Sequence, residues 1–144
     1  MMFNKSLFAV ATLVAAATAD YCCGTNIGRF AITQNWANAA MNAGGTTPGK
    51  SGDPHEFGGQ SGDGAQLKFY GADLRCNEQK PKLFEFPVMK DGSFYDKNVK
   101  HGYIGTPARV VYLQDGKTLC GVMTHFIEDR NTHQGSGPFR VCDK

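Results

Sequence analysis

Apolar and β-branched residues recur most regularly between residues 106 and 125. Two such runs, Ala108 to Leu113 and Thr118 to Thr124, are separated by the polar stretch Gln114–Lys117. An Asp-Gly pair in that stretch supplies the positive-φ position that a tight hairpin turn requires. The pattern therefore predicts an antiparallel hairpin.

The remainder of the chain predicts one helix followed by further strands. Apolar residues at steps of three and four predict a helix over 31–43, which ends at a Gly-Gly pair. Residues 44–64 are rich in Gly, Ser, Asp and Pro, which is typical of a loop with short extended pieces. Further strands are predicted at Leu67–Tyr70, Lys82–Met89 and Pro138–Cys142. This order indicates an α+β domain in which one N-terminal helix packs on a central antiparallel β-sheet.

The first 19 residues have the features of a secretory signal peptide. A short region containing Lys5 precedes the apolar run Leu7–Ala17, which is too short to span a bilayer, and small residues lead to Ala19. We expect cleavage there and one domain over 20–144, secreted and without a membrane anchor.

Charge argues against indiscriminate coating of nucleic acid. Without Lys5, the chain carries 14 basic and 13 acidic residues, a net charge of +1 with histidine neutral. Proteins that bind nucleic acid mainly by counterion release carry a much larger basic excess. The lysines between residues 80 and 100 alternate with acidic residues, so we interpret them as a solvated face.

Five cysteines follow the predicted cleavage site, and the secretory route permits disulfides between them. We expect two bridges and one unpaired thiol. Cys22 and Cys23 are adjacent, and in an extended segment they point to opposite faces, so only one of them can comfortably join a given bridge. The spacing of the five cysteines is not that of a zinc site, and no metal is predicted.

Residues 44–51 match the phosphate-loop pattern G-x-x-x-x-G-K-S. A phosphate loop follows a buried strand and opens a helix, whereas here a helix precedes the pattern and Asp53-Pro54 follows it. We interpret the match as coincidence and predict no nucleotide cofactor.

Chemically useful side chains fall on predicted strands and on one stiff turn. Arg109 and His125 lie on the two hairpin strands, and Glu85 stands between two phenylalanines whose burial would turn it to the opposite face. His55 follows Asp53-Pro54, where proline restricts the backbone. Two proton-transfer groups and a permanent cation suffice for metal-free cleavage of RNA by transesterification. A purely structural Glu85–Arg109 pair is the alternative.

Four segments resemble the fungal ribotoxins, above all the short-looped hirsutellin type, and more distantly the small secreted guanyl-specific ribonucleases. They are Gly49–His55, Leu83–Pro87, Pro107–Tyr112 and Cys120–His125. Their order agrees with the family, and the resemblance extends from the helix to Cys142. It implies the microbial ribonuclease fold.

The resemblance also implies roles for the four chemical residues. Glu85 would be the general base and His125 the general acid, while His55 and Arg109 would stabilise charge on the phosphate. The implied product is a 2′,3′-cyclic phosphate, formed without metal or cofactor.

Three further residues receive auxiliary roles by the same resemblance. Asp53 would adjust the network around His55, and Phe139 would flank the catalytic histidine. Asp63, in a glycine-rich loop, is a candidate for guanine binding, with a simple turn residue as the equal alternative.

The resemblance implies the disulfides Cys23–Cys142 and Cys76–Cys120, since Tyr21-x-Cys23 matches the start of the family pattern. Cys22 is then the unpaired thiol.

The leading hypothesis is a monomeric secreted endoribonuclease that cleaves the sarcin-ricin loop of large-subunit ribosomal RNA and inhibits translation. A general guanyl-specific ribonuclease acting on single-stranded RNA is the first alternative, favoured by the low net charge and the short segment between Cys23 and the helix. A non-catalytic ribonuclease-like effector is the second. The presence of base, acid and cation together argues against the latter.

Overall fold

The computed structural model describes residues 20–71 and 73–144. The described part begins with a two-stranded hairpin, β1 (Tyr21–Thr25) and β2 (Gly28–Ile32), followed by helix α2 (Gln34–Gly44). A five-stranded antiparallel sheet comes next, in the order β3-β4-β5-β6-β7. Its strands are β3 (His55–Phe57), β4 (Leu83–Pro87), β5 (Ala108–Leu113), β6 (Leu119–Glu128) and β7 (Gly135–Val141). The α+β prediction is confirmed.

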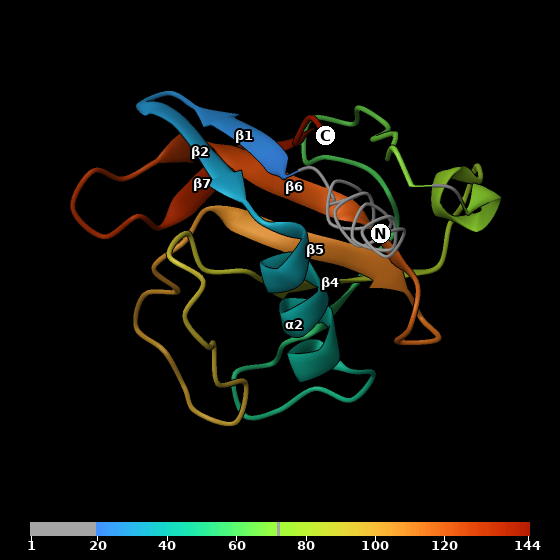
Figure 1. Cartoon of the computed structure of the whole chain (residues 1–144), viewed down its shortest axis with the longest axis horizontal. Helices are drawn as coiled ribbons and strands as arrows, with labels where there is room; N and C mark the ends of the chain where they lie inside the picture. The colour runs from blue at the N-terminus through green and yellow to red at the C-terminus, as the bar shows by residue number, and fades with distance from the viewer. Residues whose placement is uncertain (1–19, 72) are drawn as a thin grey trace, which may run out of the picture.

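Helix α2 lies across one face of the sheet, and the β1–β2 hairpin lies along β6 (Figure 1). Between helix and sheet is the larger hydrophobic core, because every second residue of each strand faces the helix. The sheet contributes Phe84, Phe86, Val110, Tyr112 and Val122.

The opposite face of the sheet carries a second apolar cluster. Leu67 and Phe69, from the long connection between β3 and β4, cover strand residues there. Those strand residues are Leu83, Val111, Leu113 and Met123. Both faces of the sheet are therefore partly covered, and the positions not covered on the second face are free for chemistry.

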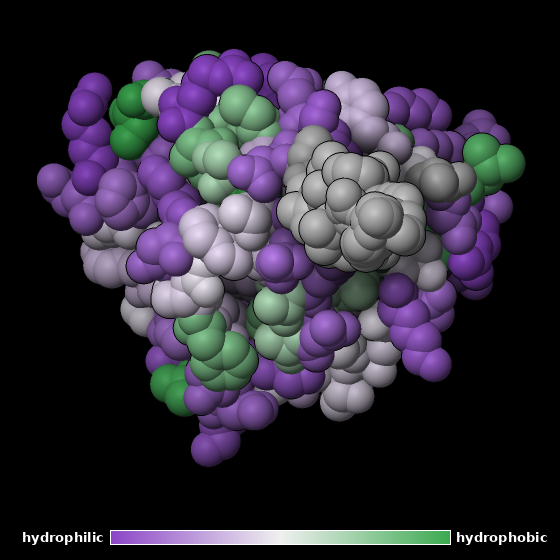
Figure 2. All heavy atoms as spheres, viewed as in Figure 1, coloured by the Kyte–Doolittle hydropathy of each residue, from purple (hydrophilic) through white to green (hydrophobic). Residues whose placement is uncertain are grey.

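Hydrophilic residues predominate on the face viewed in Figure 2, where the hydrophobic residues form small separate patches. Among the described residues, no helix is long and apolar enough to cross a membrane. The predicted signal peptide, residues 1–19, lies outside the described residues.

The hairpin around Asp115-Gly116 is confirmed, with Gly116 at a φ of 73°. Its second strand continues beyond the predicted end, as far as Glu128, because β7 pairs with this extension. The predicted strands at 82–89 and 138–142 correspond to β4 and β7, with boundaries shifted by up to three residues.

Two predicted elements need correction. The helix begins at Gln34, not at Ala31, because Ala31 and Ile32 pair with β1 and the Thr33 side chain accepts the Trp36 N–H as the N-cap. Residues 67–70 form no strand, because the backbone of Phe69 bonds to the Asn77 side chain and not to a neighbouring strand.

Two disulfides close the structure, and they are the pairs that the family resemblance implies. Cys23 is bonded to Cys142, and Cys76 to Cys120, while Cys22 is free. The first bridge joins residues 119 positions apart and so ties both ends of the domain together. A loop of that length restricts the unfolded chain strongly, by roughly 4 to 5 kcal/mol in the chain-entropy account.

Glu128, at the end of β6, fastens the N-terminal hairpin and two loops to the sheet. Its buried carboxylate accepts hydrogen bonds from Thr25, Lys90 and His133. Burial raises the pKa of Glu128, but the hydrogen bonds from Lys90, His133 and Thr25 outweigh burial and lower the pKa below its ordinary value. These hydrogen bonds to the Glu128 carboxylate therefore stabilise the fold fully at pH values above the ordinary pKa of glutamate.

The variant Glu128→Gln should lower the free energy of unfolding at pH 7 by roughly 2 kcal/mol, since a buried charged hydrogen-bond network is weakened. The difference from the unmodified chain should shrink as pH falls through the depressed pKa, because the native carboxyl is then neutral too. Urea unfolding at a series of pH values measures the difference in unfolding free energy and its change with pH. Exposed Glu78→Gln is the control, and a pH-independent difference would contradict the assignment.

Candidate active site

The strand register brings the predicted catalytic residues onto the same sheet face. His55 in β3 lies opposite Glu85 in β4, and Arg109 in β5 lies two positions along from the residue opposite Glu85. His125 in β6 lies two positions beyond the partner of Arg109. Directly opposed residues and every second residue share a face, so all four side chains emerge on the side away from α2.

Asp53, His55, Glu85 and Arg109 form a continuous series of charged and polar contacts. The His55 Nδ1 atom lies 3.0 Å from Asp53 Oδ1 and 3.9 Å from Glu85 Oε1. Glu85 Oε1 lies 3.5 Å from Arg109 Nε. Only the first of these distances is that of a strong hydrogen bond, so Glu85 is held mainly by electrostatic attraction.

Glu85 has the properties of a base kept available for a proton. Its side chain is 14% exposed, and its Oε1 atom is buried without a hydrogen-bond partner. Burial raises the pKa of Glu85 above its ordinary value, although the charges of Arg109 and His55 oppose the rise and that of Asp53 adds to it. A raised pKa brings a carboxylate closer to the pH at which it works efficiently as a general base.

Arg109 is fixed before any substrate arrives. Its Nη1 atom donates to the carbonyls of Thr106 and Ala108, and its side chain is only 7% exposed. Burial lowers the pKa of Arg109, but a guanidinium remains charged at any physiological pH. A cation with so little freedom can stabilise developing negative charge without reorganisation.

His125 is oriented from two sides. Its Nδ1–H donates to the Gly137 carbonyl at 2.8 Å, and its ring stacks on Phe139 with centroids 3.9 Å apart. The other ring nitrogen, Nε2, is thereby left to exchange a proton with a substrate. Burial lowers the pKa of His125; the hydrogen bond to Gly137 opposes this, and the charge of Arg109 lowers it further.

Phe139 lies where the resemblance implied, against the imidazole of His125. Its backbone N–H donates to the Ser61 hydroxyl, which joins the glycine-rich loop to β7. In that loop Asp63 accepts from the Ala65 N–H as a turn residue does, and its carboxylate lies 3.9 Å from Arg140. The carboxylate remains about half exposed, so base binding by Asp63 stays a prediction.

Sequence reasoning missed two contributors to this site. Tyr95 donates its hydroxyl to Asp53 from a loop that shows no periodic pattern. Gly135 approaches His125 so closely that a side chain would collide with the imidazole. Neither contact joins residues that are neighbours in sequence, and neither the loop residue Tyr95 nor Gly135, the first residue of β7, gives a signal of its own in the sequence.

The arrangement can hold a phosphodiester between a base and an acid, with a fixed cation beside the base. Asp53, His55 and Glu85 also place ligand atoms within 4.8 Å of one another, a spacing that a metal ion could use. Carboxylate and imidazole are acceptable ligands for zinc. Any test of the chemistry therefore has to control the metal content.

No protein-family model matches the chain. It is 29% identical over 133 residues to the ribonuclease α-sarcin of Aspergillus giganteus, covering 79% of this chain and 72% of that protein. Ribonuclease clavin of Aspergillus clavatus is 29% identical over 134 residues with the same coverage. Among solved structures, the Aspergillus ribotoxin restrictocin superposes with a TM-score of 0.66 at 26% identity, over 88% of this chain and 100% of restrictocin.

Fold, disulfides and relatives together define a protein with the microbial ribonuclease fold. Within that class the chain is a homologue of the Aspergillus ribonucleases α-sarcin and clavin, and it matches the ribotoxin restrictocin in structure.

The variant Gly135→Ala should reduce RNA cleavage at least tenfold. A Cβ atom at this position would lie 2.7 Å from His125 Cδ2 and 2.8 Å from the backbone of Pro107, so the imidazole has to move. Displacement of a reacting group by about 1 Å can reduce a rate a hundredfold. Initial rates of oligonucleotide cleavage measure the effect.

Gly102→Ala is the matched control, since a Cβ atom there meets nothing within 4 Å. An unchanged rate in Gly135→Ala, with the native fold verified by circular dichroism, would contradict the placement of His125 as the acid.

Proposed function

We propose that the protein is a secreted endoribonuclease that cleaves the sarcin-ricin loop of large-subunit ribosomal RNA and so inhibits translation. The observation that carries the proposal is the convergence of Glu85, His55, Arg109 and His125 on one sheet face. Its homologues are ribonucleases, and restrictocin has been crystallised with a 29-mer sarcin/ricin domain RNA analogue.

The geometry supports a transesterification in two proton transfers. Glu85, as carboxylate, takes the proton of the ribose 2′-hydroxyl, whose oxygen then attacks the adjacent phosphorus. The bond from phosphorus to the 5′-oxygen breaks, and His125 gives a proton to that oxygen as it leaves. Arg109 and His55 stabilise the negative charge on the phosphorane, and the products are a 2′,3′-cyclic phosphate and a 5′-hydroxyl.

Secretion is part of the proposal. Residues 1–19 have the pattern of a signal peptide, and the two disulfides suit an oxidising compartment. We propose that RNA is the partner and that the chain acts as a monomer.

A general ribonuclease on single-stranded RNA is the second candidate function. Two observations favour it: the predicted mature chain carries a net charge near +1, and the β1–β2 hairpin is only five residues per strand. Both features limit the basic surface available to grip a ribosome.

Intact ribosomes and naked single-stranded RNA, treated separately with equal protein, distinguish the two candidates. The proposal expects one discrete fragment of large-subunit RNA and little degradation of the naked RNA. A ladder of guanine cuts in naked RNA without a discrete ribosomal fragment would favour the general ribonuclease. No cleavage of either, with the fold verified, would refute catalysis and leave the non-catalytic effector.

Glu85→Gln and His125→Gln should each lower the cleavage rate by roughly 10² to 10⁴, because each removes one proton-transfer group. Both substitutions nearly preserve side-chain size, so circular dichroism and thermal unfolding should remain close to the unmodified chain. Exposed Glu56→Gln, next to His55 in β3, is the control. Residual activity above about one hundredth in both variants would contradict the assigned roles.

The rate–pH profile should be a narrow bell in the mildly acidic range. Cleavage needs Glu85 ionised and His125 protonated, which gives limbs near pH 4.3 and 6.5 for ordinary side chains. The raised pKa of Glu85 moves the acid limb upward, and the lowered pKa of His125 moves the basic limb downward. Cleavage rates measured between pH 3 and 9 test this, and a rate that rises steadily to pH 9 would contradict it.

A further inference from the structure

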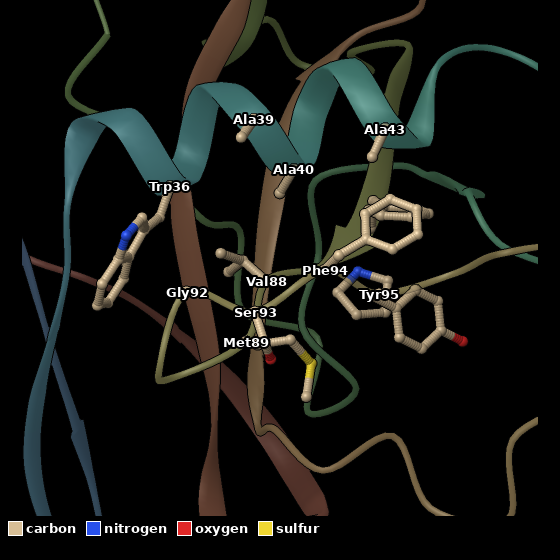
Figure 3. A pocket seen from close by; sticks show the side chains of 12 residues that line it. Trp36, Ala39, Ala40, Ala43, Val88, Met89, Gly92, Ser93, Phe94 and Tyr95 are labelled. Atoms are coloured by element: carbon tan, nitrogen blue, oxygen red, sulfur yellow. The ribbon is translucent and has the colours of Figure 1, made fainter.

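Tyr95 lies in the long loop between β4 and β5, with its hydroxyl on the active-site network. The residue is 6% exposed, and its ring packs edge-on against Phe86 and stacks on His101. The ring lines an apolar cavity of about 130 Å³ beneath α2. Figure 3 shows that the hydroxyl points away from this cavity, and it donates to Asp53 Oδ2 at a distance of 2.7 Å.

Asp53 divides its carboxylate between two partners. One oxygen accepts from Tyr95, and the other lies 3.0 Å from His55 Nδ1. The Asp53 side chain is only 4% exposed, and among the described residues no third side chain donates a hydrogen bond to its carboxylate. The orientation of this carboxylate therefore depends on the tyrosine hydroxyl, since an unpartnered buried oxygen is costly.

We propose that Tyr95 is a positioning residue of the cleavage reaction, which holds the His55 imidazole beside Glu85 and the scissile phosphate by fixing Asp53. This inference rests on the proposed function. His55 itself is 60% exposed at its side chain, so little else restrains the ring. A contact on the buried side of Asp53 thus controls an exposed catalytic group.

The loop that carries Tyr95 is fastened well enough for this task. Lys97 donates to the carbonyls of Gly44, the last residue of α2, and of Thr47, three residues further on, and the Lys97 carbonyl accepts the Ser51 N–H. The turn before Asp53 and the loop of Tyr95 are therefore held together by backbone as well as side chain. Burial, with the hydrogen bond to Asp53, raises the pKa of Tyr95 to about 12, so the hydroxyl remains a donor wherever Glu85 and His125 can act.

Tyr95→Phe is the direct test, because it removes the hydroxyl and keeps the ring contacts. On a short RNA oligonucleotide kcat should fall roughly tenfold while KM changes less than twofold. The acid limb of the pH profile should move to higher pH, because the charge of a well-placed His55 lowers the pKa of Glu85. Tyr103→Phe, in the same loop and 68% exposed, is the matched control and should leave kcat and the acid limb unchanged.

A double-mutant cycle separates positioning from a general loss of stability. Once Asp53→Asn has disrupted the network, addition of Tyr95→Phe should change kcat less than twofold. A further tenfold loss in the Asp53→Asn background would show that Tyr95 acts by another route, and it would overturn the proposal.

Histidine NMR gives a readout that does not depend on activity. In Tyr95→Phe the ring resonances of His55 should change, while those of His133, which is paired with Glu128, should not. Unchanged His55 signals would overturn the role of Tyr95 even in an active enzyme. Failure of the unmodified protein to cleave RNA would instead refute the proposed function, and the NMR comparison would still decide whether Tyr95 positions His55.

Discussion

The ion pair between Glu85 and Arg109 is the interaction on which the rest of the site depends. Both side chains are more than four-fifths buried, on the sheet face that also carries the second apolar cluster. A buried carboxylate without a cation costs several kcal/mol, and so does a buried guanidinium without an anion. Their 3.5 Å separation satisfies the charges while leaving Glu85 Oε1 without a hydrogen bond. The fold therefore tolerates this ion pair, and the Glu85 carboxylate stays reactive enough to take a proton.

The antiparallel sheet explains how one small domain carries both a core and a reaction site. Side chains alternate across each strand, so β4 places its phenylalanines under α2 and Glu85 on the other face. The strands β5 and β6 repeat this division for Arg109 and His125. The disulfide Cys23–Cys142 then fixes the two ends of the domain together. A rigid sheet suits a mechanism that relies on preset positions more than on motion.

Alternation along the strand predicted that Glu85 faces away from the two phenylalanines beside it, and the family resemblance supplied the disulfides. The contacts that hold the site were not predictable in this way. Tyr95 and Asp53 are 42 residues apart, and each lies in a segment without periodicity, so only the folded loop brings them together. The wrong strand at 67–70 has the same cause: its residues have strand propensity, but Asn77 occupies the backbone groups that a neighbouring strand would need. Side-chain caps of this kind override local propensity.

The chemistry proposed for this sheet face is cleavage of RNA by proton transfer alone, with no metal ion. The ends of the RNA fragments test it most directly, with the metal chelator EDTA present because Asp53, His55 and Glu85 could themselves hold an ion. We expect cleavage undiminished by EDTA, a 2′,3′-cyclic phosphate on one fragment and a 5′-hydroxyl on the other, as mass spectrometry can establish. A 5′-phosphate with a 3′-hydroxyl, or cleavage abolished by EDTA and restored by a divalent metal, would contradict it.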